Sequence, residues 1–593
     1  MDKTAIIVIS LCVVLFGLNW HYAQKKQTAR QAELERQRVE QVAQPPPAAA
    51  QPLPPARPAD EQLSAAPELV TPEGDLAPEQ ECALENDYFR VRLTTHGGGV
   101  KRVELKKHHA GIDQPVILNN GARLPVFNIS GWMAGANLIG WQIAASDAGS
   151  VTFTRELQPN LTVTRRFTVS GDYQLTLDQI ITNSSADPKD LKVLPPYRLA
   201  LGAVTALHPE NGAAEERYVT LSWYTVGDSY GSGQLGSFSD TAPLGFKLWS
   251  GKKVIDSGGD AIRWAAVKSQ FFAMMVNCLG FDAQRAEGTR QYFPDLQSNP
   301  NAAVPAGIVG DLTVSGVTVN PGTSVAQQFS FYAGPKENSR LQALPDNQAK
   351  IMEFGWFGII SRALLWLMNA IHDVIPNYGV AIICVTIILR AVLWWPQSSA
   401  NRSMKRMQAV APLMKETQAK FKDKPEKLNQ EMMKIYKDYG VNPVGSCLPM
   451  LIQFPIFIGF YWMLQSSIEL RHEHFLWIKD LSQPDTVWRL AFGPAFSLPI
   501  NPMPLLMTLT MYLSMRISPQ PQGVDNPMMK MMKFMPLFFL LFCYNFSSAL
   551  SLYWTAQNIL SIVQMRYNLR QVAPTLEAMK AQAVARRKAQ HKR

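Results

Sequence analysis

The apolar stretch VTIILRAVLWWPQ, residues 385–397, contains one arginine, Arg390. It ends a run of residues long enough to enter a lipid bilayer. An arginine at the centre of a membrane helix costs about 2.5–3.5 kcal/mol on insertion scales. Two interpretations are open. Arg390 extends along its aliphatic stem to the interface that Trp394, Trp395 and Pro396 mark, or it faces a water-filled cavity inside the protein.

Other apolar stretches predict an α-helical polytopic membrane protein with six spans. An uncleaved anchor is expected at residues 1–22, because Asn19, Trp20 and His21 follow its apolar run where a cleaved signal peptide has small residues. The other five predicted spans are 379–396, 446–465, 498–517, 534–547 and 549–566. The middle one is proline-rich at its start (FSLPINPMP).

Charge is distributed unevenly between the segments that connect these spans. The chain has a formal net charge of +10 and a mean hydropathy of -0.06. Residues 397–445 and the tail 567–593 are strongly basic, whereas residues 466–487 lean acidic. Because Lys and Arg concentrate in cytoplasmic loops, both basic segments and both termini are predicted to be cytoplasmic. The basic tail then lies at a cytoplasmic surface, and no DNA partner is expected.

Between the anchor and the remaining spans the sequence predicts a tether and a β domain. Residues 23–80 include QPPPAAAQPLPPARP and are expected to be an extended tether. Residues 81–345 contain short alternating segments such as LTVTRRFTVS and YQLTLDQIIT, which are typical of an antiparallel β-sandwich. On the topology above, this domain lies outside the cytoplasm. Cys82 and Cys278 would share that compartment, so a disulfide between them is left open.

Two helical segments are predicted to stay outside the membrane interior. Residues 351–376 mix Trp, Phe and Leu with polar residues, as in an amphipathic helix at the membrane interface. Residues 397–445 predict a charged helical hairpin broken at DKPE.

Polar side chains recur on three of the predicted spans. Thr386 precedes Arg390 by one turn, Tyr553 precedes Gln557 by one turn, and Gln453 precedes Tyr461 by two turns. Each stripe alone is compatible with hydrogen bonding between helices. No predicted span between residues 379 and 566 contains an aspartate or glutamate to pair with the arginine. Together these features favour a hydrophilic groove.

Methionines in the cytoplasmic hairpin are compatible with a soft surface for varied apolar segments, and equally with ordinary packing. They are Met404, Met407, Met414, Met432 and Met433.

The sequence contains no convincing catalytic, metal or cofactor motif; RHEHF (471–475) lacks the spacing of a metal site. A transporter or channel with an extracytoplasmic sensor domain is the competing class, although no internal repeat of the apolar segments supports it.

Three motifs resemble the YidC membrane protein insertases of Gram-negative bacteria. They are TIILR (386–390), GVNPVGSCLPMLIQFPIFIGFYWML (440–464) and LSLYWTAQNILSIVQ (550–564). The resemblance covers essentially the whole chain. Trp554 stands where some members have a second tyrosine, so an aromatic contact is kept and a hydroxyl is lost.

The resemblance implies a β-supersandwich periplasmic domain and a five-helix insertase core in the inner membrane. It implies a groove that contains Arg390, with Thr386, Gln453 and Tyr553 as its polar walls. Nascent membrane proteins would be the substrates, without a nucleotide or cofactor. The implied partners are the SecYEG translocon, SecDF, the lipid bilayer and the ribosome, which the basic tail would contact.

Overall fold

The computed structural model describes residues 78–111, 114–132, 140–207, 213–239, 251–297, 304–422, 424–439, 441, 448–491, 497–517, 534–569, 575–581 and 584. The predicted anchor (1–22) and all but the end of the tether (23–80) lie outside these residues, as does most of the basic tail.

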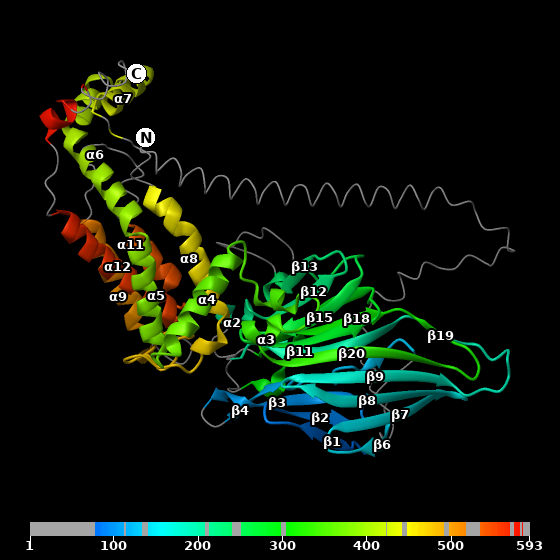
Figure 1. The fold of residues 1–593 in the computed structure, drawn as a ribbon. Coiled ribbons are helices and arrows are strands. Elements are labelled where there is room, and N and C mark those ends of the chain that lie inside the picture. The colour runs from blue at the N-terminus through cyan, green and yellow to red at the C-terminus, as the bar shows by residue number, and fades with distance from the viewer. Residues whose placement is uncertain are drawn as a thin grey trace, which may run out of the picture.

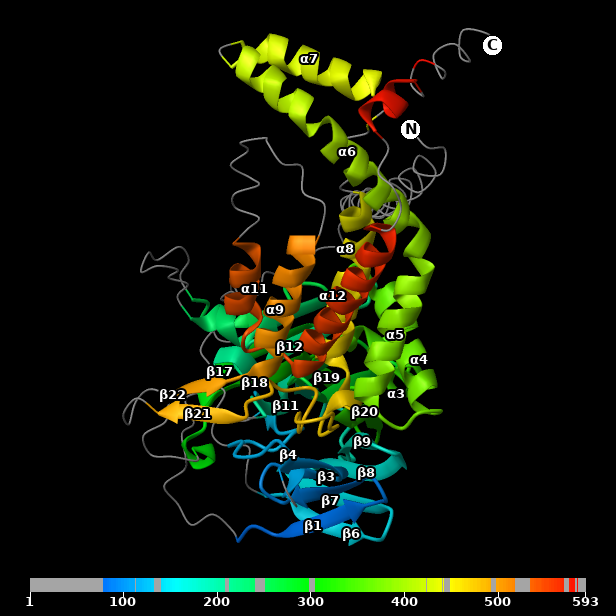
Figure 2. The same ribbon diagram turned by 90° about the vertical axis from the view of Figure 1, so that its left-hand side faces the viewer.

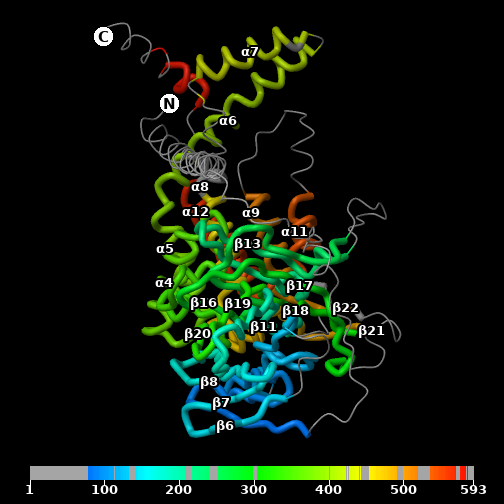
Figure 3. The backbone as a smooth tube through the Cα atoms, turned by 90° about the vertical axis from the view of Figure 1, so that its right-hand side faces the viewer, coloured from blue at the N-terminus to red at the C-terminus, as the bar shows by residue number. Residues whose placement is uncertain are grey.

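A β-rich domain lies beside a helical region, at the end of the helices opposite α7 (Pro425–Asp438) (Figures 1 and 3). Its largest sheet has nine strands in the order β13-β12-β15-β16-β20-β9-β8-β7-β6. These are β13 (Tyr230–Gln234), β12 (Thr220–Thr225), β15 (Ile262–Lys268), β16 (Phe272–Leu279), β20 (Ser324–Pro335), β9 (Gln174–Asn183), β8 (Leu161–Gly171), β7 (Ser150–Gln158) and β6 (Gln142–Ser146).

Two smaller sheets pack against the large one and enclose the core. The first has the order β14-β17-β18-β11-β5 and comprises β14 (Ile255–Asp256), β17 (Arg285–Tyr292), β18 (Ala306–Val314), β11 (Tyr197–Thr205) and β5 (Ile129–Ser130). The second comprises β1 (Glu81–Glu85), β2 (Phe89–Thr94), β3 (Gly99–Gly111) and β4 (Gln114–Leu118). A short pair joins β10 (Lys192–Leu194) to β19 (Val317–Val319).

Strand β8 shows how the alternating sequence produces this sandwich. Leu161, Val163 and Phe167 point into the core, and so does Arg165, which is 0% exposed. The Arg165 guanidinium donates to the Gly98 carbonyl at 2.8 Å and to Gln179 Oε1 at 2.9 Å. The alternation thus fixes which residues are buried, but it does not reveal that one core position holds a charge.

Three glycines in THGGGV (residues 95–100) let the backbone turn so that its carbonyl groups reach Arg165. Gly97 and Gly98 have φ values of 84° and 56°, which residues with a Cβ rarely adopt. A Cβ on Gly98 would also lie 2.4 Å from the Trp141 ring. The tight turn therefore requires glycine here.

Cys82 in β1 and Cys278 in β16 are both free thiols. The sequence left a disulfide between them open because both lie in the same predicted compartment. The structure contains no such bond.

The helical region contains eight main helices among the described residues. They are α4 (Gly358–His372), α5 (Tyr378–Val392), α6 (Trp394–Lys420), α7, α8 (Leu448–Ser466), α9 (Pro502–Ile517), α11 (Met535–Cys543) and α12 (Ser548–Leu569). Two short helices, α2 (Ala213–Glu216) and α3 (Asn338–Gln342), belong to the β domain. Helix α4 buries Leu364 and Met368 but exposes 79% of Ile359 and 71% of Trp366, an amphipathic pattern of the kind expected for residues 351–376.

The first helix of the predicted core ends earlier than the sequence indicates. Residues 379–396 were expected to form one span, but the helix breaks at Leu393 and restarts as α6, with an angle of 59° between the two parts. Pro396 explains the break, since it has no N–H to donate to the Val392 carbonyl and its ring crowds that group. The charged hairpin therefore begins at Trp394 and not at Gln397.

The predicted spans at 498–517 and 534–547 are also shorter than expected. Residues Ser497–Ile500 form a strand, β22, and α9 begins only at Pro502. Pro499, Pro502 and Pro504 disfavour helix in the residues that precede them. Helix α11 has nine residues.

Among the described helices, none is by itself both long and apolar enough to cross a bilayer, whereas the bent pair α5–α6 is, by length and composition.

Candidate functional site

Helices α5 and α12 pack side by side and bring Arg390 and Tyr553 together. The start of α5 is fixed by Asn377, whose side chain accepts a hydrogen bond from the Val380 N–H at 3.0 Å. Arg390 lies in the last turn of the helix. Because the Cα–Cβ bonds of a helix tilt toward its N-terminus, the Arg390 side chain starts back along α5, away from the end of the helix.

Arg390 is buried without a counter-ion among the described residues. Its side chain is 5% exposed, and its Nε has no hydrogen-bond partner there. The Tyr553 phenol, 2% exposed, is the described group close enough to interact with its charge. An unpaired buried charge is strongly destabilising. A fold that keeps one therefore points to a functional role, and its position within the helix packing disfavours extension to the interface.

Thr386 and Gln557 flank this pair on the same two helices. Thr386 is fully buried, and its hydroxyl donates to the Ile382 carbonyl of its own helix at 2.7 Å. Gln557 is 7% exposed and lies one turn beyond Tyr553. Gln453 on α8 is half-buried. The structure thus places Thr386 and Arg390 on α5, Tyr553 and Gln557 on α12, and Gln453 on α8. Of these, it brings Arg390 and Tyr553 close enough to interact.

Helix α8 meets α12 through aromatic rings. Phe460 stacks on Tyr553, with centroids 4.1 Å apart, and Phe457 contacts Trp554 at 4.6 Å. Phe539 of α11 also contacts Trp554, with centroids 4.7 Å apart. Trp554 therefore packs in an aromatic cluster formed by α8, α11 and α12.

Tyr461 contacts aromatic residues of its own helix and of the turn before α12. Its ring centroid lies 6.5 Å from that of Phe457 and 5.9 Å from that of Phe546. A place for Tyr461 in the groove stays a prediction.

Two polar residues of α12 hold helices together. Asn558 donates to the Met507 carbonyl of α9 at 3.4 Å, and Gln564 donates to the Trp394 carbonyl of α6 at 3.2 Å. The sequence left open that polar residues on the spans only form hydrogen bonds between helices. Asn558 and Gln564 do form such bonds.

The hairpin methionines divide into buried and exposed positions. Met407 and Met414 are 8% and 4% exposed, in a small apolar core with Met579 of the C-terminal segment. Met432 is half-buried against this core, and Met404 is half-buried. Met433 is 54% exposed and lines an open hollow along α7. The sequence did not indicate which methionines support the hairpin and which remain accessible.

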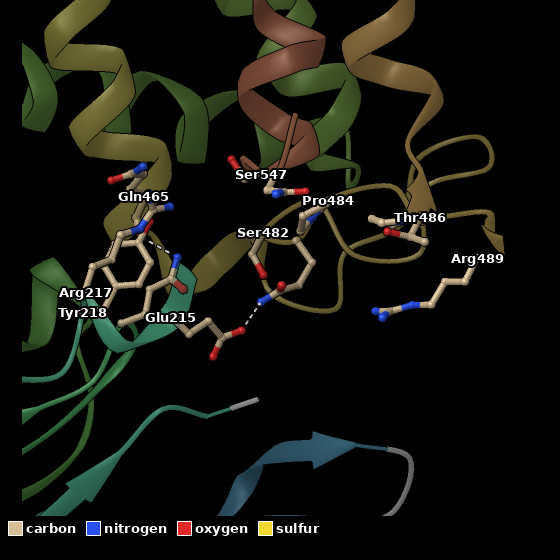
Figure 4. A pocket seen from close by; sticks show the side chains of 13 residues that line it. Glu215, Arg217, Tyr218, Gln465, Ser482, Pro484, Thr486, Arg489 and Ser547 are labelled. Carbon is tan, nitrogen blue, oxygen red and sulfur yellow. Dashed lines mark hydrogen bonds between the residues drawn. The ribbon is translucent and has the colours of Figure 1, made fainter. Parts of the chain in front are cut away.

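A polar cavity of about 200 Å³ lies where the β domain meets the helical region (Figure 4). Its lining is rich in amide and hydroxyl groups. The residues are Glu215, Arg217, Tyr218, Gln270, Gln465, Ser482, Gln483, Pro484, Thr486, Arg489, Pro499, Asn545 and Ser547. Sequence reasoning missed this cavity because its walls come from distant segments. No cluster of His, Cys, Asp or Glu able to hold a metal occurs among the described residues.

Hydrogen bonds beside this cavity join the two parts of the molecule. Gln270 donates to the Gln465 carbonyl at 3.2 Å, and Gln483 donates to Glu215 at 3.3 Å. His472, from the RHEHF segment, lies 2.9 Å from the His109 carbonyl through its Nε2. His472 therefore contributes a contact between the helical region and the β domain.

Glu469 is a half-buried acid of the loop after α8. Desolvation of its carboxyl raises its pKa to about 7, and the nearby charge of Glu337 acts in the same direction. Its Oε2 has no hydrogen-bond partner among the described residues. The surroundings of this carboxyl therefore disfavour its charged form.

Comparison with known proteins covers both parts of the chain. The family model of the 60Kd inner membrane protein matches residues 370–575, and that of the YidC periplasmic domain matches residues 81–367. The membrane protein insertase YidC of Nitratidesulfovibrio vulgaris (strain DP4) is 30% identical over 546 residues, covering 86% of this chain and 91% of the relative. The Haemophilus influenzae (strain ATCC 51907) insertase YidC is 31% identical over 507 residues, covering 82% and 85%. A crystal structure of an active YidC insertase, 14% identical, covers 84% of this chain and 94% of its own with a TM-score of 0.33.

Proposed function

This chain belongs to the YidC family of membrane protein insertases, and on that premise we propose that it inserts its substrates through a hydrophilic groove around Arg390. The family resides in the inner membrane and has a periplasmic domain. Insertases are not enzymes, so the proposed role of the site is to bind and hydrate a passing segment. Family membership favours this role over a transporter or channel.

The observation that carries the proposal is the buried Arg390 guanidinium, which has no carboxylate partner among the described residues. A fixed positive charge in a low-dielectric surrounding attracts an acidic or polar segment more strongly than it would in water. Such a segment would supply the partner that Arg390 lacks among the described residues. Release of the substrate's apolar helix into lipid supplies the driving force, so no nucleotide is needed.

We also propose how the other sequence-predicted residues contribute. Thr386, Gln453, Tyr553 and Gln557 provide the polar walls, while Tyr461 and Trp554 belong to the aromatic surface along which an apolar helix slides. Met433 supports a capture role for the hairpin because it is exposed. The less exposed methionines of the hairpin maintain the shape of the surface that Met433 presents. They are Met404, Met407, Met414 and Met432.

The proposed topology has six spans with both termini in the cytoplasm. The basic hairpin and tail then face anionic lipid and ribosomal RNA, to which Lys and Arg bind by charge neutralisation. Cooperation with SecYEG and SecDF is proposed from the family resemblance.

Replacement of Arg390 tests the groove. In cells depleted of their own insertase, R390A is expected to lower insertion of a small substrate with an acidic N-terminal tail by about tenfold or more, equivalent to a loss of about 1.4 kcal/mol. R390K is expected to retain most insertion because it keeps the charge. Insertion is measured by protease accessibility of the substrate, at matched levels of each variant.

Arg362 offers a matched control, since it lies on α4 and is exposed. R362A is expected to insert the same substrate normally. Normal insertion by R390A would show that the charge is not required. Equal loss with R390K would instead show that the guanidinium geometry, and not the charge, is needed.

A further inference from the structure

A two-stranded hairpin links the loop after α8 to the start of α9. It pairs β21 (Trp488–Ala491) with β22 (Ser497–Ile500) in antiparallel register. Among the described residues these strands form a sheet of their own. A single hairpin is at best marginally stable in water, so this one needs a surface to rest on.

The register sorts the hairpin side chains onto two different faces. Trp488 pairs with Ile500 and Leu490 with Leu498, whereas Arg489 pairs with Pro499. Directly opposed residues share a face, and successive residues alternate. One face is therefore apolar throughout, and the other presents Arg489 and Pro499.

The second face already has a neighbour. Arg489 and Pro499 both line the polar cavity between the β domain and the helices. The apolar face, by contrast, is open in the described part of the chain, since Trp488, Leu490 and Leu498 are 67%, 41% and 42% exposed. Three large exposed apolar side chains on one small hairpin indicate an interaction surface.

The position of the hairpin indicates what covers that face. Figure 2 shows it extending sideways from the ends of α9 and α11, across the direction of the helices. Its base is fixed there, because Tyr544 donates to the Pro499 carbonyl at 2.7 Å and Asn501 donates to the Tyr544 carbonyl at 2.8 Å. Helix α9 begins at Pro502, directly after β22 ends at Ile500, and its Leu505 and Leu509 are 45% and 54% exposed.

We propose that the β21–β22 hairpin rests in the periplasmic leaflet of the bilayer, with Trp488, Leu490 and Leu498 in lipid and Arg489 toward the polar cavity. Exposed leucines on a helix of a membrane protein face acyl chains, and the hairpin continues that surface. Tryptophan is favoured at the level of the lipid headgroups. The hairpin then separates lipid from the water of the cavity. This proposal rests on family membership and not on the role of Arg390.

Environment-sensitive probes at adjacent positions test the proposal. The six native cysteines are replaced by alanine, and single cysteines L490C, L498C and R489C are labelled with the fluorophore NBD. The purified full chain is reconstituted in vesicles of phosphatidylethanolamine and phosphatidylglycerol. Probes at 490 and 498 are expected to emit at shorter wavelength and to be quenched by doxyl-labelled lipid. The probe at 489 is expected to be quenched by iodide instead.

Two other results would overturn the proposal. Quenching of all three probes by iodide would place the whole hairpin in water. Protection of 490 and 498 from both quenchers would mean that protein covers the face; recovery of iodide quenching on dilution with lipid would identify a second copy.

A benzophenone amino acid at 490 or 489, in a chain that keeps its cysteines, provides an independent check. Phospholipid adducts are expected only from position 490.

Discussion

The ion pair between Lys268 and Glu353 fixes the residue at which the chain leaves the β domain for α4. Lys268 is 2% exposed, and its Nζ lies 2.8 Å from Glu353 Oε2. The same ammonium donates to the Ile351 carbonyl at 3.0 Å. Burial of Glu353 disfavours its charge, but the charge and hydrogen bond of Lys268, together with hydrogen bonds from Ser232 and Tyr230, outweigh burial and lower its pKa to about 2.

Replacement of Glu353 by glutamine is predicted to destabilise the protein in a pH-dependent way. At pH 7 the variant leaves a buried ammonium without its partner, so the free energy of unfolding should fall by about 3 kcal/mol. A lowered acid pKa contributes stability above the unfolded value of 4.5, and this contribution is lost as pH falls toward 2. The difference in free energy of unfolding between E353Q and the unchanged protein should therefore shrink as pH falls from 4.5 toward 2. Denaturant unfolding of the full chain at several pH values measures it.

Arg285 provides the surface control for this comparison. Its ion pair with Asp256 spans 3.3 Å between side chains that are 47% and 40% exposed, and the Arg285 Nε also lies 3.3 Å from Glu287, which is 18% exposed. Such pairs contribute about 0–1 kcal/mol. R285A should leave the stability nearly unchanged. A loss as large as that of E353Q would mean that the assay does not report on burial of the charge.

At the scale of elements, the hairpin formed by α6 and α7 separates structural from accessible methionines. M414A is predicted to cost about 2–5 kcal/mol of local stability, because it opens a cavity in a small core. Faster amide hydrogen exchange in both helices would report this loss. M433A should leave exchange unchanged and reduce cross-linking of the hairpin to a nascent chain. Unchanged cross-linking with M433A would contradict a capture role for that residue.

Some elements follow from the sequence more directly than others. The alternation in LTVTRRFTVS predicts strand β8, and the family resemblance of TIILR and LSLYWTAQNILSIVQ is confirmed by the matching family models. The ends of helices were harder to predict, since Pro396 breaks one predicted span and Pro499 belongs to a strand. Residues around the polar cavity could not be predicted, because their proximity depends on how two domains dock.

For the whole molecule, neutral hydrogen bonds at the junction are predicted to set the orientation of the β domain. Gln270 donates to the Gln465 carbonyl, and Ser466 donates to the Met352 carbonyl at 3.2 Å. Each such bond contributes about 0.5–1.5 kcal/mol. The double variant Q270A/S466A should broaden the distance distribution between spin labels at positions 324 and 516. Q284A, whose side chain bonds Ser315 within the β domain, should not.

The break at Leu393 has a mechanical consequence. Helix α6 contains 27 residues, which at 1.5 Å each form a lever about 40 Å long. A rotation of about 10° at its base would carry the far end through an arc of about 7 Å. Because Arg390 lies one turn before this break, a rotation there would displace the distal end of the hairpin much further than the residues around Arg390.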